Sequence, residues 1–134
     1  MTETTAVGGA GAAPGKALHI GLWVLQGFAT LAFLGASSAK LLGKPEMVAL
    51  FETIGVGQWF RYVTGILELS GAVLLLIPKT RSAAAVLLAT VMVGAIATHL
   101  FILHNAPTAP LVLLGVTSFI AWGRRGELAS LLGR

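Results

Sequence analysis

One carboxylate, Glu68, stands in the middle of an otherwise apolar run, residues 60–77. The run reads as a membrane-spanning helix, and a charged side chain at the bilayer centre costs roughly 2.5–3.5 kcal/mol on insertion scales. A chain that keeps such a carboxylate must give it a partner, a proton or a water-filled cavity. We therefore expect Glu68 to face the interior of a helical membrane protein, and we expect any specific function to involve it.

The composition excludes a water-facing surface over most of the chain. The 134 residues are 56% hydrophobic and 10% charged, whereas a soluble domain carries about 25% charged residues. The net charge of +4 does not indicate a nucleic-acid partner, because the Lys and Arg residues are scattered between apolar runs and form no basic stripe with aromatic residues. The chain has no cysteine, so thiol chemistry and cysteine-bound metals are excluded within it.

The apolar runs predict an all-α fold: an integral membrane four-helix bundle with a short interfacial helix between the first two spans. Each span is near the roughly 20 residues that a bilayer demands, except the last, which is shorter. The predicted spans cover residues of about 17–39, 59–77, 82–103 and 108–122.

The segment between the first two spans, residues 44–58, has a different pattern. Met47, Leu50, Phe51 and Ile54 recur at helical spacing and form one apolar face. The segment is too short to cross a bilayer. It is therefore predicted to be an amphipathic helix that lies in the membrane interface.

The remaining segments complete the predicted domain organisation. Residues 1–15 are rich in Gly and Ala without periodicity, which is typical of a disordered tail. Residues 16–125 form the transmembrane domain, and residues 126–134 form a short C-terminal tail.

Four spans place both chain ends on the same side of the membrane. The positive-inside rule assigns the side with more Lys and Arg to the cytoplasm. The opposite side carries Lys40, Lys44 and Arg61. The prediction is therefore a multi-pass protein of the cytoplasmic membrane with both termini inside, where the larger basic set collects: Lys16, Lys79, Arg81, Arg124, Arg125 and Arg134.

Helical spacing gives Glu68 a set of neighbours on its own helix. The positions that share its face carry a cation, a hydroxyl and three small residues, and small residues let another helix approach closely. These positions are Arg61, Thr64, Gly65, Gly71 and Ala72.

Two further polar residues lie where Glu68 can reach them, so we predict an internal polar cluster that opens to the outer face. Lys40 ends the first span, and His99 lies toward the outer end of the third span. No catalytic residue and no metal site is assigned, because two histidines five positions apart do not share a helix face. The predicted cluster consists of Lys40, Arg61, Thr64, Glu68 and His99.

Two roles for Glu68 stay open. In the structural role it is protonated, or paired with Arg61, Lys40 or His99, and it orients the helices. In the functional role it relays protons or binds a ligand. The structural role is preferred. His99 is likewise interpreted as an interfacial histidine bonded to a backbone carbonyl, with proton transfer or a bond to a quinone carbonyl as the alternative.

Small and weakly polar residues in two spans are assigned to helix packing. Thr90, Gly94 and Thr98 are each four apart in the third span, and this spacing predicts close approach of a neighbouring helix. Gln26 and Thr30 lie about one turn apart in the first span and are predicted to hydrogen-bond within the bundle.

Residues 35–81 and 93–101 resemble the DoxX-like family of small four-helix bacterial membrane proteins, and the resemblance covers about residues 18–125. Lys40 and the turn at Gly55–Gly57 fit its pattern, as does the Ala97–His99 element. The second span carries the rest of the pattern at Gly65, Glu68, Gly71, Leu74, Leu75 and Pro78.

The resemblance implies a four-helix bundle in the bacterial cytoplasmic membrane. It also implies a non-catalytic or accessory role in a membrane redox or stress-related assembly, with the bilayer and membrane redox subunits as partners. Two alternatives stay open: a quinone-binding oxidoreductase subunit, and a small proton-coupled transporter. No cofactor is assigned; a quinone is a candidate, and no metal is expected.

Overall fold

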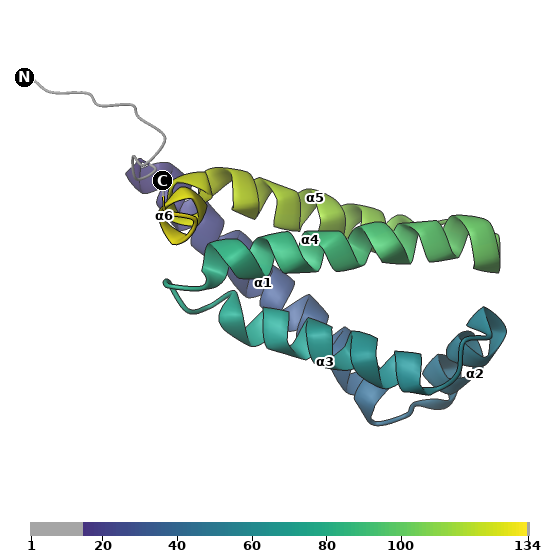
Figure 1. Cartoon of the computed structure of the whole chain (residues 1–134). Helices are drawn as coiled ribbons and strands as arrows, with labels where there is room; N and C mark the ends of the chain where they lie inside the picture. The colour runs from purple at the N-terminus through teal and green to yellow at the C-terminus, as the bar shows by residue number, and fades with distance from the viewer. Residues whose placement is uncertain (1–14, 134) are drawn as a thin grey trace, which may run out of the picture.

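The computed structural model describes residues 15–133, which form helices joined by short turns (Figure 1). The prediction of an all-α protein is confirmed, because this range contains six α-helices, one π-helical segment and no strand. The predicted disordered tail lies, apart from Gly15, outside the described residues. The elements are α1 (Lys16–Leu41), α2 (Pro45–Ile54), α3 (Trp59–Leu74), α4 (Arg81–Thr98), η2 (His99–Leu103), α5 (Thr108–Gly123) and α6 (Arg125–Leu131).

The four longest helices pack around one apolar core. Helices α4 and α5 lie side by side, α3 lies beside α4, and α1 crosses behind them in contact with α3 and α5 (Figure 1). The short α6 contacts α4 and α5, and α2 lies at the other end of the molecule against α3 and η2. The core consists of Leu22, Ala29, Phe33, Ala72, Leu75, Ala84, Ala85, Leu88, Met92 and Ile120.

Two glycines set how closely α3 approaches its neighbours. A Cβ atom on Gly65 would lie 2.9 Å from side-chain atoms of Leu41, and one on Gly71 would lie 2.5 Å from Leu88 Cδ2. Both positions are buried. Gly65 thus lets α1 approach α3, and Gly71 lets α4 approach from another side.

The helix predicted as the second span ends earlier than expected. Helix α3 stops at Leu74 rather than at residue 77, and the next residues form a turn. Pro78 accounts for the difference, because a proline has no N–H to donate to the carbonyl four residues earlier, that of Leu74, and its ring clashes with that carbonyl. The Thr80 hydroxyl donates to the Leu74 carbonyl at 2.9 Å and so satisfies one acceptor at the open helix end.

The helix predicted as the third span ends at the expected residue but changes its winding. Helix α4 is α-helical to Thr98 and continues as the π-helical η2 through Leu103. The chain leaves the helix at His104, which has a left-handed φ of 54°. The segment before it, Arg81–Leu103, is 23 residues long.

Within residues 15–133, two helical segments are long and apolar enough to cross a membrane: Lys16–Leu41, with a mean hydropathy of 1.6, and Arg81–Leu103, with 2.3. Helices α3 and α5 have 16 residues each, fewer than the roughly 20 that a span requires. Large hydrophobic side chains point outward along the helices, with Leu31 73% and Phe101 75% exposed. A surface of this kind suits contact with lipid rather than with water.

The predicted packing row on the third span is wrong for the described part of the chain. Thr90 and Gly94 are exposed, and a Cβ on Gly94 would meet nothing within 4 Å. The hydroxyls of Thr90 and Thr98 donate within their own helix, to Val86 and Gly94 carbonyls at 2.8 and 2.9 Å. Small residues at this spacing permit a close neighbour, but Gly94 and Thr98 instead line a cavity that separates them from α2 and α3.

Candidate functional site

Glu68 forms an ion pair with Lys40 that joins α3 to the end of α1. Lys40 Nζ donates to Glu68 Oε1 at 2.8 Å. The Glu68 side chain is 4% exposed and that of Lys40 is 14% exposed, so water screens the pair weakly. Of the three predicted partners of Glu68, the structure brings Lys40 to it.

Arg61 is buried but does not bond to Glu68. Its Nη1 donates to the backbone carbonyl of Lys40, and its Nε donates to Gln58 Oε1 at 2.7 Å. Gln58 in turn donates to the Val48 carbonyl on α2 at 3.0 Å. The guanidinium therefore holds the C-terminal end of α1, where a positive charge is favourable, and fixes the backbone that carries Lys40.

Thr64 and His99 complete the predicted cluster without bonding to its charges. The Thr64 hydroxyl donates to the Phe60 and Arg61 carbonyls at 3.0 and 3.1 Å, within its own helix. His99 Nδ1 lies 2.5 Å from Asn105 Oδ1. The histidine partner is thus a side-chain amide rather than the predicted backbone carbonyl.

The ion pair, Thr64 and His99 all line one cavity of about 260 Å³. It lies between the end of α1, α2, the part of α3 from Phe60 to Glu68, and the C-terminal half of α4 with η2. Apart from these polar groups its walls are mainly apolar, and they come from Leu50, Phe51, Ile54, Phe60, Val91 and Leu103. Four of the five residues predicted to form one polar cluster, all except Arg61, therefore meet around an apolar space, with a single charged pair at its wall.

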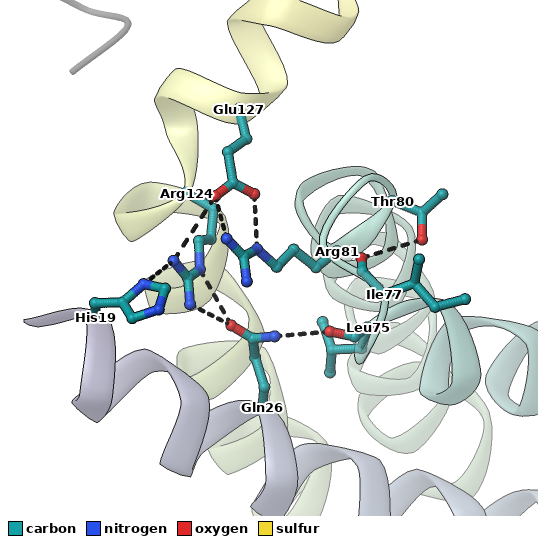
Figure 2. Close-up of polar contacts among 8 residues, drawn as sticks. All are labelled: His19, Gln26, Leu75, Ile77, Thr80, Arg81, Arg124 and Glu127. Atoms are coloured by element: carbon teal, nitrogen blue, oxygen red, sulfur yellow. Dashed lines mark hydrogen bonds and ion pairs between the residues drawn. The ribbon is translucent and has the colours of Figure 1, made fainter. Parts of the chain in front are cut away.

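A second polar cluster lies at the opposite end of the molecule, around Arg124 (Figure 2). Arg124 Nε and Nη2 donate to Gln26 Oε1 at 3.1 and 3.0 Å, and Nη1 lies 2.8 Å from His19 Nδ1. Gln26 Nε2 donates to the Leu75 carbonyl at 2.7 Å. One side chain therefore connects α1 to the α5–α6 junction, and Gln26 extends the connection to the end of α3.

Arg81 and Glu127 close the same cluster from α4 and α6. Arg81 Nε and Nη2 donate to the two carboxylate oxygens of Glu127 at 2.8 and 2.5 Å, a bidentate arrangement (Figure 2). Glu127 also lies 3.7 Å from Arg124 Nη1. The Trp23 ring lies near both guanidinium groups, at 5.3 and 6.0 Å. We call His19, Gln26, Arg81, Arg124 and Glu127 the arginine cluster.

In the arginine cluster, the Glu127 carboxylate balances the charges of two neighbouring arginines. Burial, followed by the neighbouring charge of Arg81, lowers the pKa of Arg124 from its ordinary value, and Glu127 acts in the opposite direction. An arginine nevertheless keeps its charge in proteins. Two buried cations are therefore held together by one shared carboxylate.

The sequence predicts Arg81 and Arg124 only as topology signals and predicts no site for His19 or Glu127. Gln26 was assigned to packing within the bundle, and the structure confirms that it bonds there, as does Thr30, whose hydroxyl donates to the Ala72 carbonyl at 3.1 Å. Glu127 lies three residues after Arg124, and this spacing is the signal that the prediction missed. The spacing alone does not indicate that both side chains turn inward.

The two long apolar helices and the outward-facing hydrophobic side chains are typical of a membrane protein. The sequence model of the DoxX-like family matches residues 24–121, which is most of the chain. The chain therefore belongs to the DoxX-like family. No curated protein and no solved structure matches it. The matched segment contains Lys40, Glu68 and His99, whereas His19 and Arg124 lie outside it.

Proposed function

We propose that this DoxX-like protein is a multi-pass protein of the bacterial cytoplasmic membrane that acts as a non-catalytic, accessory subunit of a redox or stress-related assembly. Residues 16–125 are the membrane domain, with α1, α3, α4–η2 and α5 as its four spans. Both termini face the cytoplasm, and α2 lies in the outer interface. This orientation follows the positive-inside rule and puts the arginine cluster at the cytoplasmic end.

The observation that carries the accessory role is the pairing of Glu68 with Lys40. An acidic side chain inside a membrane domain is a functional candidate by default, and its partner decides which function. Here the partner is Lys40, whose Nζ lies 2.8 Å from Glu68 Oε1. Arg61 donates to the Lys40 carbonyl and so fixes the backbone that carries this lysine. A carboxylate neutralised by a fixed cation joins two helices, which is the work of a structural pair rather than of a proton relay.

The short helices α3 and α5 support association with other membrane subunits. A helix of 16 residues spans about 24 Å at 1.5 Å per residue, less than the roughly 30 Å of the hydrocarbon core. Short spans are accommodated by thinning of the bilayer or by oligomerisation. Oligomerisation with other membrane subunits is the solution that an accessory subunit can use.

Co-purification from native membranes tests this proposal. A tagged full-length protein, isolated in a mild detergent, is expected to retain membrane subunits that carry a redox cofactor, in a fixed ratio measured by quantitative mass spectrometry. Glu68→Gln is expected to weaken that association, whereas Glu52→Gln, at an exposed carboxylate on α2, is the matched control. Isolation of the wild-type protein without any such subunit, or redox turnover by the purified protein alone, contradicts the accessory role.

A further inference from the structure

The cavity beside the Lys40–Glu68 pair has hydrogen-bonding capacity that the protein itself does not use. Glu68 Oε1 accepts from Lys40, and among residues 15–133 the second carboxylate oxygen has no hydrogen-bond partner. Glu68 is only 3% exposed. Lys40 Nζ likewise uses one of its three donors in the described hydrogen bonds. Both residues line the cavity, so these free hydrogen-bonding positions are available to an occupant.

The walls specify the rest of the occupant. The lining is apolar on α2, on Phe60 of α3 and on Val91 of α4. A volume of about 260 Å³ falls just below the range of roughly 300–1,000 Å³ for drug-sized ligands. The space therefore suits one hydrocarbon chain or a small ring.

The charge balance at the polar end selects the headgroup. The ion pair has no net charge, so an anionic head competes with Glu68 for Lys40, and a cationic head meets the lysine charge. A hydroxyl avoids both costs, because it donates to the free oxygen of Glu68 and accepts from Lys40 at the same time. We infer that the cavity binds a neutral amphiphile from the bilayer, with a hydroxyl head at the Lys40–Glu68 pair and an apolar body along α2 and α4.

This inference goes beyond the accessory role. The two are tested separately, because ligand binding is measured by labelling of the cavity and the accessory role by co-purification. The experiment uses the full-length protein in phosphatidylcholine nanodiscs and three photoreactive probes. The probes carry the same hydrocarbon chain and end in an alcohol, a carboxylate or an ammonium group. Labelled residues are mapped by mass spectrometry.

The alcohol probe is expected to label residues on α2, α4 and η2 about tenfold more than either charged probe, the factor expected from one hydrogen bond to a charged group. Excess unlabelled long-chain alcohol is expected to compete with the alcohol probe. This competition is measured on the wild-type protein, so it does not depend on the folding of any variant. Glu68→Gln leaves the lysine charge unpaired and is expected to shift the preference to the carboxylate probe.

A pair of glycine substitutions separates the cavity from general partitioning into the bilayer. Gly94 lines the cavity, and a Cβ there meets nothing within 4 Å, so Gly94→Leu is expected to fill the space and abolish labelling. Gly115 on α5 is equally open but does not line the cavity, so Gly115→Leu is the matched control. Equal labelling by all three probes, or no competition by the alcohol on the wild-type protein, overturns the inference.

Discussion

Gln26 Oε1 accepts two hydrogen bonds from the Arg124 guanidinium, at 3.1 and 3.0 Å, although 98 positions separate the two residues in the chain. The contact joins α1 to the junction of α5 and α6 inside the protein. Arg124 is 1% exposed and Gln26 is fully buried. The first and the last parts of the described chain are therefore tied together by polar contacts, whereas the core between them is apolar.

Replacing Arg124 is expected to loosen this end of the molecule. Arg124→Met removes the donors to Gln26 and His19 and leaves Gln26 Oε1 unpaired, at a cost of about 1.5–3 kcal/mol. The measurement is the midpoint of thermal unfolding in detergent. Arg125→Met is the matched control, because Arg125 is exposed and bonds only to the nearby Trp122 carbonyl among the described residues. Equal midpoints for the two variants contradict the assigned role.

The Lys40–Glu68 pair is expected to be strongly coupled. Removing either partner alone, in Lys40→Met or Glu68→Leu, leaves a buried charge and is expected to lower the free energy of unfolding by about 3–5 kcal/mol. The double variant replaces both charges by apolar groups and is expected to lose much less than the sum. A double-mutant cycle measures the difference. Additive losses indicate that the two side chains act independently.

Adding a single methyl group at Gly71 is expected to lower the stability of the protein. The Cβ of Gly71→Ala lies 2.5 Å from Leu88 Cδ2 in a buried position, and overpacking of this kind costs about 1–3 kcal/mol. Gly115→Ala, on an open helix face, is expected to stabilise the protein by up to about 1 kcal/mol through helix propensity. Unfolding midpoints that shift in the same direction for both variants contradict the close α3–α4 contact.

The proposed orientation can be tested with single cysteines, because the chain has none of its own. Glu52 on α2 and Ser130 on α6 are both exposed. In intact spheroplasts, a membrane-impermeant maleimide is expected to label Glu52→Cys and to label Ser130→Cys only after the membrane is opened. The reverse pattern places the termini outside and contradicts the positive-inside assignment.

The helices were largely predictable from the sequence because their signals are local. Apolar runs and proline positions indicated where α1, α4 with η2, and α5 begin and end, and the spacing around Glu68 indicated a buried stripe on α3. That stripe is buried at Arg61, Gly65, Glu68, Gly71 and Ala72. The early end of α3 was missed because the local effect of Pro78 reaches back into the helix.

The candidate sites were only partly predictable, because side-chain partners depend on how the helices meet. Arg61 was grouped with Glu68 on helical spacing, and Lys40 and His99 were grouped with it on depth. The structure gives Glu68 the lysine, sends Arg61 to a helix end, and pairs His99 with Asn105. Depth along a helix determines which residues are level with each other, but not which of them face each other.

The sequence by itself determined that the chain is helical and apolar, that it belongs to the DoxX-like family, and that Glu68 must be compensated inside the protein. These conclusions rest on local periodicity and on the cost of burying a charge. Only the tertiary structure decided which cation compensates it, that an apolar cavity lies beside the pair, and that Arg124 turns inward to Gln26. The reason is that each of these contacts joins residues distant in the chain, and helix packing alone sets their relative positions.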